Sequence, residues 1–321
     1  MSGKIDPIES ILSQHSIMIL DGALATELEA HGCNLDDPLW SARVLLENPE
    51  LIYRVHADYF RAGADCAITA SYQATIDGFA ARGIKEAEAI ELIKKTVQLA
   101  KRARDDFWKE NRETNRPKPM VAGSVGPYGA YLADGSEYVG NYGVTDETLT
   151  EFHRPRISAL VEAGADLLAF ETIPSLQEAR VLDSLLREFP DTYAWLSFSL
   201  KNEEEISEGT KLADCARLFE NSEQIVAIGL NCAPINVVTG AIQELSANTN
   251  KPILVYPNSG ETYNAETKTW HGHEQCNAFD SQSEEWYKAG ARLIGGCCRT
   301  TPLHIEEISK RWRSSEVLLH D

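Results

Sequence analysis

The sequence predicts a single (β/α)₈ barrel of the TIM type spanning residues 1–321, with long loops after the third and seventh strands. Three observations support this prediction. Eight short apolar runs alternate with amphipathic stretches along the whole chain, as the strands and helices of an α/β protein do. One helix–turn–strand phrase recurs three times. The 321 residues also keep one type of composition throughout, which fits one barrel domain.

The predicted strands are short segments bounded by glycine, proline, asparagine or serine, as buried parallel strands are. They are Ile17–Leu20, Cys66–Ala70, Val121–Val125, Asp166–Phe170, Ala194–Leu200, Ile225–Leu230, Ile253–Tyr256 and Ala291–Gly295. An open, doubly wound sheet is the alternative. Its glycine-rich GxGxxG turn is missing after the first strand, so we favour the closed barrel.

Amphipathic stretches between the strands predict helices, most clearly at Lys85–Trp108, where apolar residues recur every three or four positions. Three helices are expected to end in an Ala-Gly-Ala phrase, at 62–64, 163–165 and 289–291, whose glycine can adopt a left-handed conformation. Ser175 and Glu178 have the spacing of a helix capping box. Pro155 is expected to kink the helical stretch Asp146–Ala163 or to start a new helix there.

Composition restricts the class of function. The formal net charge of −19 argues against a polyanionic partner such as nucleic acid or an anionic membrane surface. The sequence has neither an apolar run of the roughly 18 residues that a membrane helix needs nor a secretory signal, so we expect a cytoplasmic protein. Seven cysteines, two of them adjacent, favour thiols used for metal binding or chemistry over disulfides. The sequence does not indicate an oligomeric state.

Unusual polar residues follow the predicted strands, which is where barrel enzymes place their chemistry. They are Asp21 after the first strand, Ser71, Tyr72 and Gln73 after the second, Glu171 after the fourth, Asn231 and Cys232 after the sixth, Asn258 after the seventh, and Cys297 and Cys298 after the eighth. The two long loops, Tyr128–Val144 and Pro257–Cys276, are rich in glycine, tyrosine and polar residues. We expect them to close over the site.

Cys232 and the pair Cys297-Cys298 end strands that a barrel brings onto one rim. Three thiolates would leave one open tetrahedral position on Zn²⁺, as in a catalytic site, and sulfur ligands favour zinc over magnesium or calcium. Neighbouring residues of a regular strand point to opposite faces. We therefore expect Gly295-Gly296 to let the backbone depart from the strand, so that both sulfurs point inward.

Other interpretations of these residues remain open. The cysteines could be buried inert thiols, or the adjacent pair could form a vicinal disulfide. A rival candidate metal site consists of His271, His273 and Cys276 in the last long loop. Asp21 and Glu171 could be the acid and base of a barrel hydrolase or lyase. A non-catalytic protein that senses zinc or thiols is a further alternative.

Six motifs occur in an order that points to a known family. They are Leu20–Glu27 (LDGALATE), Gly123–Pro127 (GSVGP), Phe170–Pro174 (FETIP), Gly229–Cys232 (GLNC), Tyr256–Gly260 (YPNSG) and Gly295–Cys298 (GGCC). The sequence resembles the homocysteine S-methyltransferases over essentially its whole length, especially those that use S-methylmethionine. The GLNC and GGCC motifs are the most specific part of the match.

The resemblance implies that a Zn²⁺ ion is bound by Cys232, Cys297 and Cys298. It further implies that Asp21 and Glu171 help to hold the amino acid part of homocysteine. It assigns Ser71, Tyr72 and Gln73 to a substrate-binding region. It also puts Asn231 and Asn258 near the metal, where we expect them to bind the substrate.

The implied reaction is methyl transfer from a sulfonium donor, S-methylmethionine, to the thiolate of homocysteine, which gives methionine. No catalytic side chain is expected beyond the substrate thiolate that the metal activates. S-Adenosylmethionine is an alternative donor, and selenocysteine is an alternative acceptor.

Overall fold

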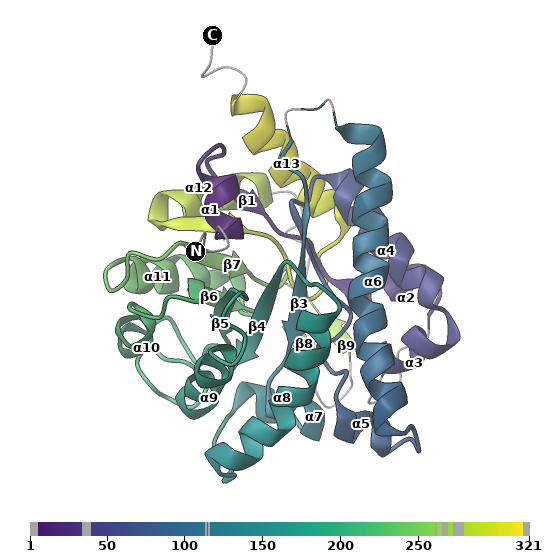
Figure 1. The fold of residues 1–321 in the computed structure, drawn as a ribbon. Helices are drawn as coiled ribbons and strands as arrows, with labels where there is room; N and C mark the ends of the chain where they lie inside the picture. Colours follow the sequence, from purple (N-terminus) through teal and green to yellow (C-terminus); the bar gives the residue numbers. More distant parts are fainter. Residues whose placement is uncertain are drawn as a thin grey trace.

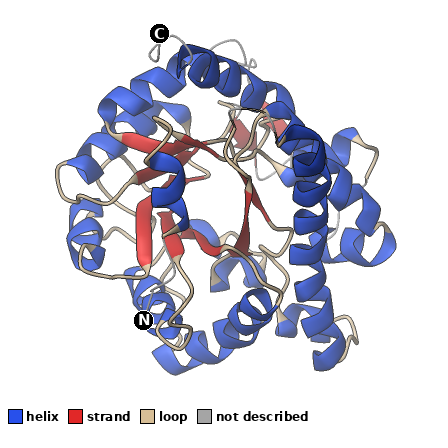
Figure 2. Ribbon diagram, turned by 45° about the horizontal axis from the view of Figure 1, so that its top comes forward, coloured by secondary structure: helices blue, strands red, loops and turns tan. Residues whose placement is uncertain are grey.

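The computed structural model describes residues 6–33, 40–112, 114, 116–260, 262–264, 269–271 and 279–316. Its centre is a parallel sheet of eight strands in the order β1-β10-β7-β6-β5-β4-β3-β2. A parallel bridge between Leu20 and Cys66 joins the two ends of this sheet, so that it closes into a barrel surrounded by helices (Figure 2). The predicted (β/α)₈ barrel is confirmed.

All eight predicted strands are present. They are β1 (Met18–Ile19), β2 (Cys66–Ile68), β3 (Met120–Val125), β4 (Leu167–Ile173), β5 (Ala194–Phe198), β6 (Ile225–Asn231), β7 (Ile253–Tyr256) and β10 (Ala291–Ile294). The prediction was wrong at the end of the fourth strand, because β4 continues through Glu171 to Ile173. In the long loop after β7, β8 (Thr262–Asn264) and β9 (Thr269–His271) form an antiparallel hairpin.

Helices cover the outside of the barrel, with the long α6 running along one side (Figure 1). They are α1 (Pro7–Leu12), α2 (Leu24–Ala30), α3 (Trp40–Glu47), α4 (Pro49–Ala62), α5 (Ile76–Ala80), α6 (Glu86–Asn111), α7 (Tyr128–Leu132), the 3₁₀ helix η1 (Ser136–Tyr138), α8 (Asp146–Glu162), α9 (Leu176–Leu186), α10 (Leu212–Phe219), α11 (Ile235–Ser246), α12 (Phe279–Ala289) and α13 (Pro302–Glu316). Pro155 lies inside one helix, α8, so it does not start a new one. Among the described residues, no helix combines the length and the apolar character needed to cross a membrane.

Two apolar layers form the core. Because side chains alternate along a strand, one set points toward the helices and the other fills the barrel. The outer layer contains Leu168 and Phe170 of β4, whereas Leu167 and Ala169 of the same strand lie in the inner layer. Ile8 and Ile11 of α1 pack into the inner layer. Figure 1 shows α1 at the end of the barrel opposite α5 and α7.

The three Ala-Gly-Ala phrases end helices as predicted. Gly63, Gly164 and Gly290 have φ angles of 123°, 79° and 132°, respectively. Such angles are open to glycine at no steric cost and strained for other residues.

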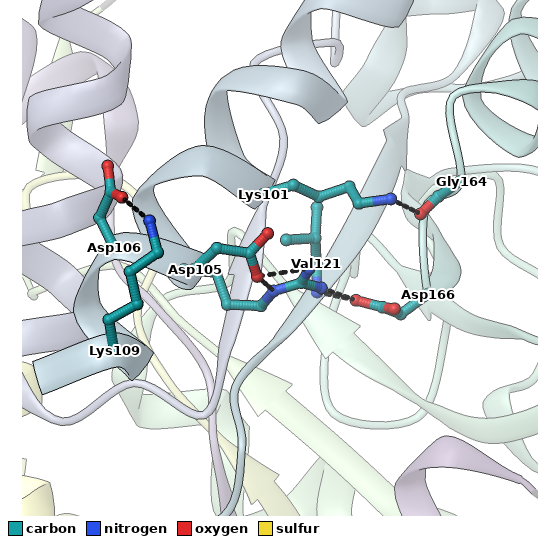
Figure 3. A network of polar contacts seen from close by, with 8 residues as sticks. Lys101, Asp105, Asp106, Lys109, Val121, Gly164 and Asp166 are labelled. Atoms are coloured by element: carbon teal, nitrogen blue, oxygen red, sulfur yellow. Dashed lines mark hydrogen bonds and ion pairs between the residues drawn. The ribbon is translucent and has the colours of Figure 1, made fainter. Parts of the chain in front are cut away.

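An aspartate follows two of these phrases and joins neighbouring strands. Asp65 accepts a 2.8 Å hydrogen bond from the N–H of Ile19 in β1. Asp166 accepts an equivalent 2.8 Å bond from the N–H of Val121 in β3, and it also forms an ion pair with Arg104 of α6 (Figure 3). These aspartates fix the helix–strand connections at the amino-terminal end of the barrel, opposite the candidate site.

Candidate active site

A polar layer lies inside the barrel at the carboxyl ends of its strands. The alternation that points Leu167 and Ala169 inward also points Glu171 inward. The buried polar side chains that meet here are Ser124 of β3, Glu171 of β4, Ser197 of β5 and Asn231 of β6, together with Tyr256 of β7. Sequence analysis singled out only Glu171 and Asn231 from this layer.

The three predicted cysteines converge directly above this layer. Cys232 follows β6, whereas Cys297 and Cys298 follow β10. Their sulfur atoms all lie within 4.8 Å of one another, and the sulfurs of Cys232 and Cys298 are 3.8 Å apart. This cluster is the one group of three or more metal-binding side chains found in the described parts of the chain.

Backbone hydrogen bonds from the end of β7 hold the cysteines in place. The N–H of Cys232 donates to Tyr256 O (3.2 Å), and the N–H of Cys297 donates to Pro257 O (2.7 Å). The carbonyl of Cys298 accepts from the N–H of Ser259 (3.0 Å). Cys232 itself has a φ of 51°, in the left-handed region that a cysteine seldom adopts. Strained backbone of this kind is typical of functional sites.

The backbone leaves the strand at Gly295 and Gly296 as predicted, because β10 ends at Ile294 and the sulfurs of both following cysteines join the cluster. Neither has a positive φ. Instead, a Cβ atom on Gly295 would lie 2.6 Å from Cβ of Leu20 and 2.8 Å from O of Asp21. A Cβ atom on Gly296 would lie 2.6 Å from Cβ of Thr300. The glycines therefore permit the close approach of β10 to β1 and to its own following turn.

The sulfur cluster is suited to a metal ion. Hydrogen bonds from the thiols of Cys232 and Cys297 hold the pKa of Cys298 well below its ordinary value, so one thiolate forms readily. Tetrahedral sulfur ligands with bonds of about 2.3 Å to Zn²⁺ lie about 3.8 Å apart. The separation of Cys232 and Cys298 fits this value. Three sulfurs leave a fourth position for another ligand.

Two buried carboxyl groups lie at the same end of the barrel. Ser124 donates a short hydrogen bond to Glu171, and the hydroxyl of Tyr256 donates to its Oε2 over 3.1 Å. Burial nevertheless raises the pKa of Glu171 to about 7. Asp21 accepts a 2.9 Å bond from the N–H of Ile68, and burial, with the nearby charge of Glu171, raises its pKa well above the ordinary value. A cation bound here would stabilise both carboxylates.

Asn231 connects the ends of three strands. Its Oδ1 accepts hydrogen bonds of 2.7 Å from the N–H of Thr172 and from the hydroxyl of Ser197. Its Nδ2 donates to the hydroxyl of Thr172 over 2.7 Å. These bonds stabilise Thr172 at a φ of 59°, and Asn231 directly precedes Cys232. The Asn231 amide is therefore used in hydrogen bonds within the protein. It positions Thr172 and Cys232, which both have a left-handed backbone conformation.

The predicted residues after β2 have different surroundings. Ser71 is buried and donates to Ser124 O over 2.8 Å. The hydroxyl of Tyr72 lies close to Thr172 and to Cys232. Of these three residues, Gln73 alone has a buried atom, Oε1, without a hydrogen-bond partner among the described residues.

Further buried polar atoms at this end of the barrel have no partner within the described part of the chain. They are Oδ1 of Asn258, Oγ of Ser259 and Oε2 of Glu137. An unsatisfied buried polar group costs about 1–3 kcal/mol. Because these three residues lie around the sulfur cluster, their unpaired atoms indicate a site for a polar ligand.

Glu137 and Tyr138 were not singled out from the sequence, although the loop that contains them was expected to cover the site. The hydroxyl of Tyr138 lies close to Cys232, while 49% of the residue remains exposed. Burial raises the pKa of Glu137, with smaller contributions from the charges of Asp134 and Cys232. Ser199 donates to the carbonyl of Glu137 over 2.9 Å. In the sequence, their one signal was the loop's enrichment in tyrosine and polar residues.

The rival metal site cannot be placed in the same way. His273 and Cys276 lie outside the described residues, and His271 is described only as part of the backbone of β9.

Comparison with known proteins decides the family. The sequence model of the family described as homocysteine S-methyltransferase matches residues 18–312. The chain belongs to the homocysteine S-methyltransferase family. This S-methyltransferase is 58% identical over 311 residues to homocysteine S-methyltransferase YbgG of Bacillus subtilis (strain 168), with 97% of this chain and 99% of that protein covered.

Solved and curated relatives agree with this assignment. The metallated form of the homocysteine methyltransferase MmuM from Escherichia coli is similar in structure, with a TM-score of 0.88 and 51% identity over 95% of this chain and 100% of that chain. Selenocysteine Se-methyltransferase of Brassica oleracea var. italica is 47% identical over 307 residues, which cover 91% of this methyltransferase and 88% of the relative.

Proposed function

We propose that this S-methyltransferase transfers a methyl group from S-methylmethionine to homocysteine in a zinc-dependent reaction, producing two molecules of methionine. The proposal assigns the whole activity to one domain, residues 1–321. It also assigns the reaction to the cytoplasm, where cysteine thiols stay reduced.

The observation that supports the proposal most is the convergence of three sulfurs above a polar layer, with unpaired buried atoms of Glu137, Asn258 and Ser259 beside them. Cys232, Cys297 and Cys298 are the residues that would hold Zn²⁺. Bound zinc would lower the pKa of the homocysteine thiol, so that it is present as the reactive thiolate at neutral pH. The metallated state of the Escherichia coli relative is consistent with this assignment.

The carboxylates of the barrel are suited to bind the ammonium group of an amino acid. Glu171 and Asp21 are buried, and their raised pKa values show that a cation nearby would be favourable. The unpaired atoms of Gln73 and Asn258 would add neutral hydrogen-bond acceptors. Binding the amino acid part in this way orients its side-chain sulfur toward the cysteine cluster.

The methyl donor must bind to a surface that stabilises its positively charged sulfonium group. Tyr72 and Tyr138 provide aromatic rings next to the cysteines, and Glu137 provides a carboxylate. In the transfer step the thiolate sulfur attacks the methyl carbon in line with the carbon–sulfur bond that breaks. The bonding electron pair stays on the departing sulfur, and two neutral thioethers result. The chain's contribution is to align the reactants and to exclude water.

Selenocysteine is a second candidate acceptor, because a selenolate would use the same site and one relative is named for that activity. Family membership favours methyl transfer over the hydrolase or lyase alternative.

A donor–acceptor assay tests the proposal. The zinc-loaded protein would be incubated with homocysteine or selenocysteine and with S-methylmethionine or S-adenosylmethionine carrying a labelled methyl group. We expect the fastest formation of labelled methionine from S-methylmethionine and homocysteine. Faster transfer from S-adenosylmethionine would contradict the assigned donor, and faster transfer to selenocysteine would contradict the assigned acceptor. Absence of transfer from both donors would contradict the reaction itself.

A further inference from the structure

A buried carboxylate behind the site has a different role from the one its sequence position suggested. Ser175 caps α9 by accepting from the N–H of Glu178 (3.3 Å), as a capping box requires. However, Oε1 of Glu178 accepts from the N–H of Tyr128 (2.6 Å) and from Nε2 of His153 (2.8 Å). Its Oε2 accepts from the hydroxyl of Tyr142 (3.1 Å). Glu178 thus anchors both ends of residues 128–142, which we name the cover segment.

His153 links this carboxylate to a buried arginine on α8. Because the guanidinium of Arg156 can only donate, Nδ1 of His153 accepts from it over 3.0 Å. Nε2 therefore bears the proton and donates to Glu178, which fixes one neutral tautomer. Arg156 also donates to Tyr72 O (2.8 Å) and Gly126 O (2.6 Å). The network Arg156–His153–Glu178 therefore contacts the loops after β2 and β3.

These loops hold the groups that face the sulfur cluster. Tyr72 lies beside Cys232, and the cover segment includes Glu137 and Tyr138, whose hydroxyl lies close to the Cys232 thiol. We propose that Arg156, His153 and Glu178 are positioning residues, which hold Tyr72 and the cover segment over the cysteines and thereby set the affinity for the thiol acceptor. This inference rests on the proposed function only for the identity of that acceptor.

The energetics of burial favour positioning over a purely structural role. All three side chains are fully buried, with relative exposures of 0%. Buried ionic groups are expensive to desolvate, and well-packed apolar residues often stabilise a fold equally well. At the surface, the ion pair of Arg154 with Glu188 (2.9 Å) already joins α8 to the turn that follows α9. Through its hydrogen bonds, the buried network holds backbone carbonyls, an N–H group and a hydroxyl of the loops in fixed positions. Apolar side chains could not form these bonds.

Three variants and one matched control test the proposal. Tyr142→Phe removes one hydroxyl from the network without disturbing the core. His153→Leu removes both ring nitrogens, and His153→Gln restores one donor and one acceptor. Glu188→Gln removes the charge from the surface pair that joins α8 to the turn after α9. Amide hydrogen–deuterium exchange of the metal-free proteins reports on the cover segment without any substrate, and steady-state kinetics on the zinc-loaded proteins separate KM from kcat.

For Tyr142→Phe and His153→Leu we expect about tenfold faster exchange within residues 128–142 and unchanged exchange in α4 and α6. We also expect KM for homocysteine to rise about tenfold while kcat changes less than about threefold. His153→Gln should recover part of both effects, and Glu188→Gln should show neither. Unchanged exchange in the cover segment of both variants would overturn the proposal, as would faster exchange with an unchanged KM. If the unaltered protein does not methylate homocysteine, the proposed function fails, yet the exchange result still tests the positioning role.

Discussion

The hydroxyl of Tyr256 donates a 3.1 Å hydrogen bond to Oε2 of Glu171, across the interior of the barrel from β7 to β4. Ser124 binds the other carboxylate oxygen. Despite these two donors, burial keeps the pKa of Glu171 near 7, so the carboxyl group is protonated in part at neutral pH.

The raised pKa predicts a pH-dependent stability. In the unfolded chain Glu171 loses its proton near pH 4.5, whereas in the folded protein it loses it near pH 7. Between these pH values the folded state binds more protons than the unfolded state. The contribution of Glu171 to the free energy of unfolding therefore falls as pH rises, by on the order of 3 kcal/mol in total. Urea unfolding of the metal-free protein and of Glu171→Gln at pH 5 and 7.5 checks this. The wild type should lose more stability than the variant over this range, and equal losses would contradict the raised pKa.

Substrate binding should depend on pH in the opposite direction. Only the ionised carboxylate of Glu171 pairs with an ammonium group, so KM for homocysteine should fall as pH rises toward 7 and then level off. Glu171→Gln should raise KM and abolish the fall of KM between acidic pH and pH 7. A variant with the same KM profile as the wild type would show that Glu171 does not bind the amino acid part.

Asn231→Ala should weaken both the fold and the metal site. The substitution leaves the N–H of Thr172 and the hydroxyl of Ser197 without their partner, at about 1–3 kcal/mol for each buried group. We expect a loss of about 3 kcal/mol in the free energy of unfolding and weaker zinc binding, because Cys232 follows directly. Asn221→Ala, at an exposed turn position, is the control and should change stability by less than about 0.5 kcal/mol. An Asn231 variant as stable as the control would refute the positioning role of this amide.

Gly295→Ala tests the close approach of β10 to β1. The added methyl group would lie 2.6 Å from Cβ of Leu20 and 2.8 Å from O of Asp21, so the strand ends must separate. We expect a loss of about 1–3 kcal/mol, measured by urea unfolding, together with weaker zinc binding at Cys297. Gly240→Ala is the control, because its Cβ would meet only the exposed side chain of Glu203 and alanine favours a helix. Equal stability of the two variants would contradict the steric explanation.

At the amino-terminal end of the barrel, Asp65→Ala should destabilise the protein without altering the site. Asp65 is buried and binds Arg313 of α13 at 2.5 Å as well as the N–H of Ile19. Removing one partner of a buried pair costs about 3–5 kcal/mol. Asp214→Ala removes an exposed pair with Arg217 and should cost at most about 1 kcal/mol. Chemical denaturation distinguishes the two, and a small effect at Asp65 would contradict its role as an anchor for the C-terminal helix.

Most of the barrel could be predicted from the sequence because strand and helix periods are local properties. Strand ends were less certain, and the extension of β4 through Glu171 depends on a register shift against β5 that no local pattern indicates. The cysteines could be predicted to converge because the carboxyl ends of parallel strands meet on one rim.

The remaining site residues depend on tertiary contacts. Tyr138 lies in a loop without periodicity, and nothing local shows that its hydroxyl reaches Cys232. Ser124 and Tyr256 belong to the motifs GSVGP and YPNSG, but nothing local shows that their hydroxyls bind Glu171. Glu178 matched a capping motif, yet its carboxylate instead holds the loop that begins at Tyr128.

Zinc content per chain is the most direct test of the cysteine centre. The wild-type protein, the variants Cys232→Ser, Cys297→Ser and Cys298→Ser, and the control Cys33→Ser would each be loaded with zinc, freed of excess metal against a chelator and measured by elemental analysis. We predict about one zinc per chain in the wild type and the control, and markedly less in each of the three variants. Full zinc content in all three variants would contradict the account.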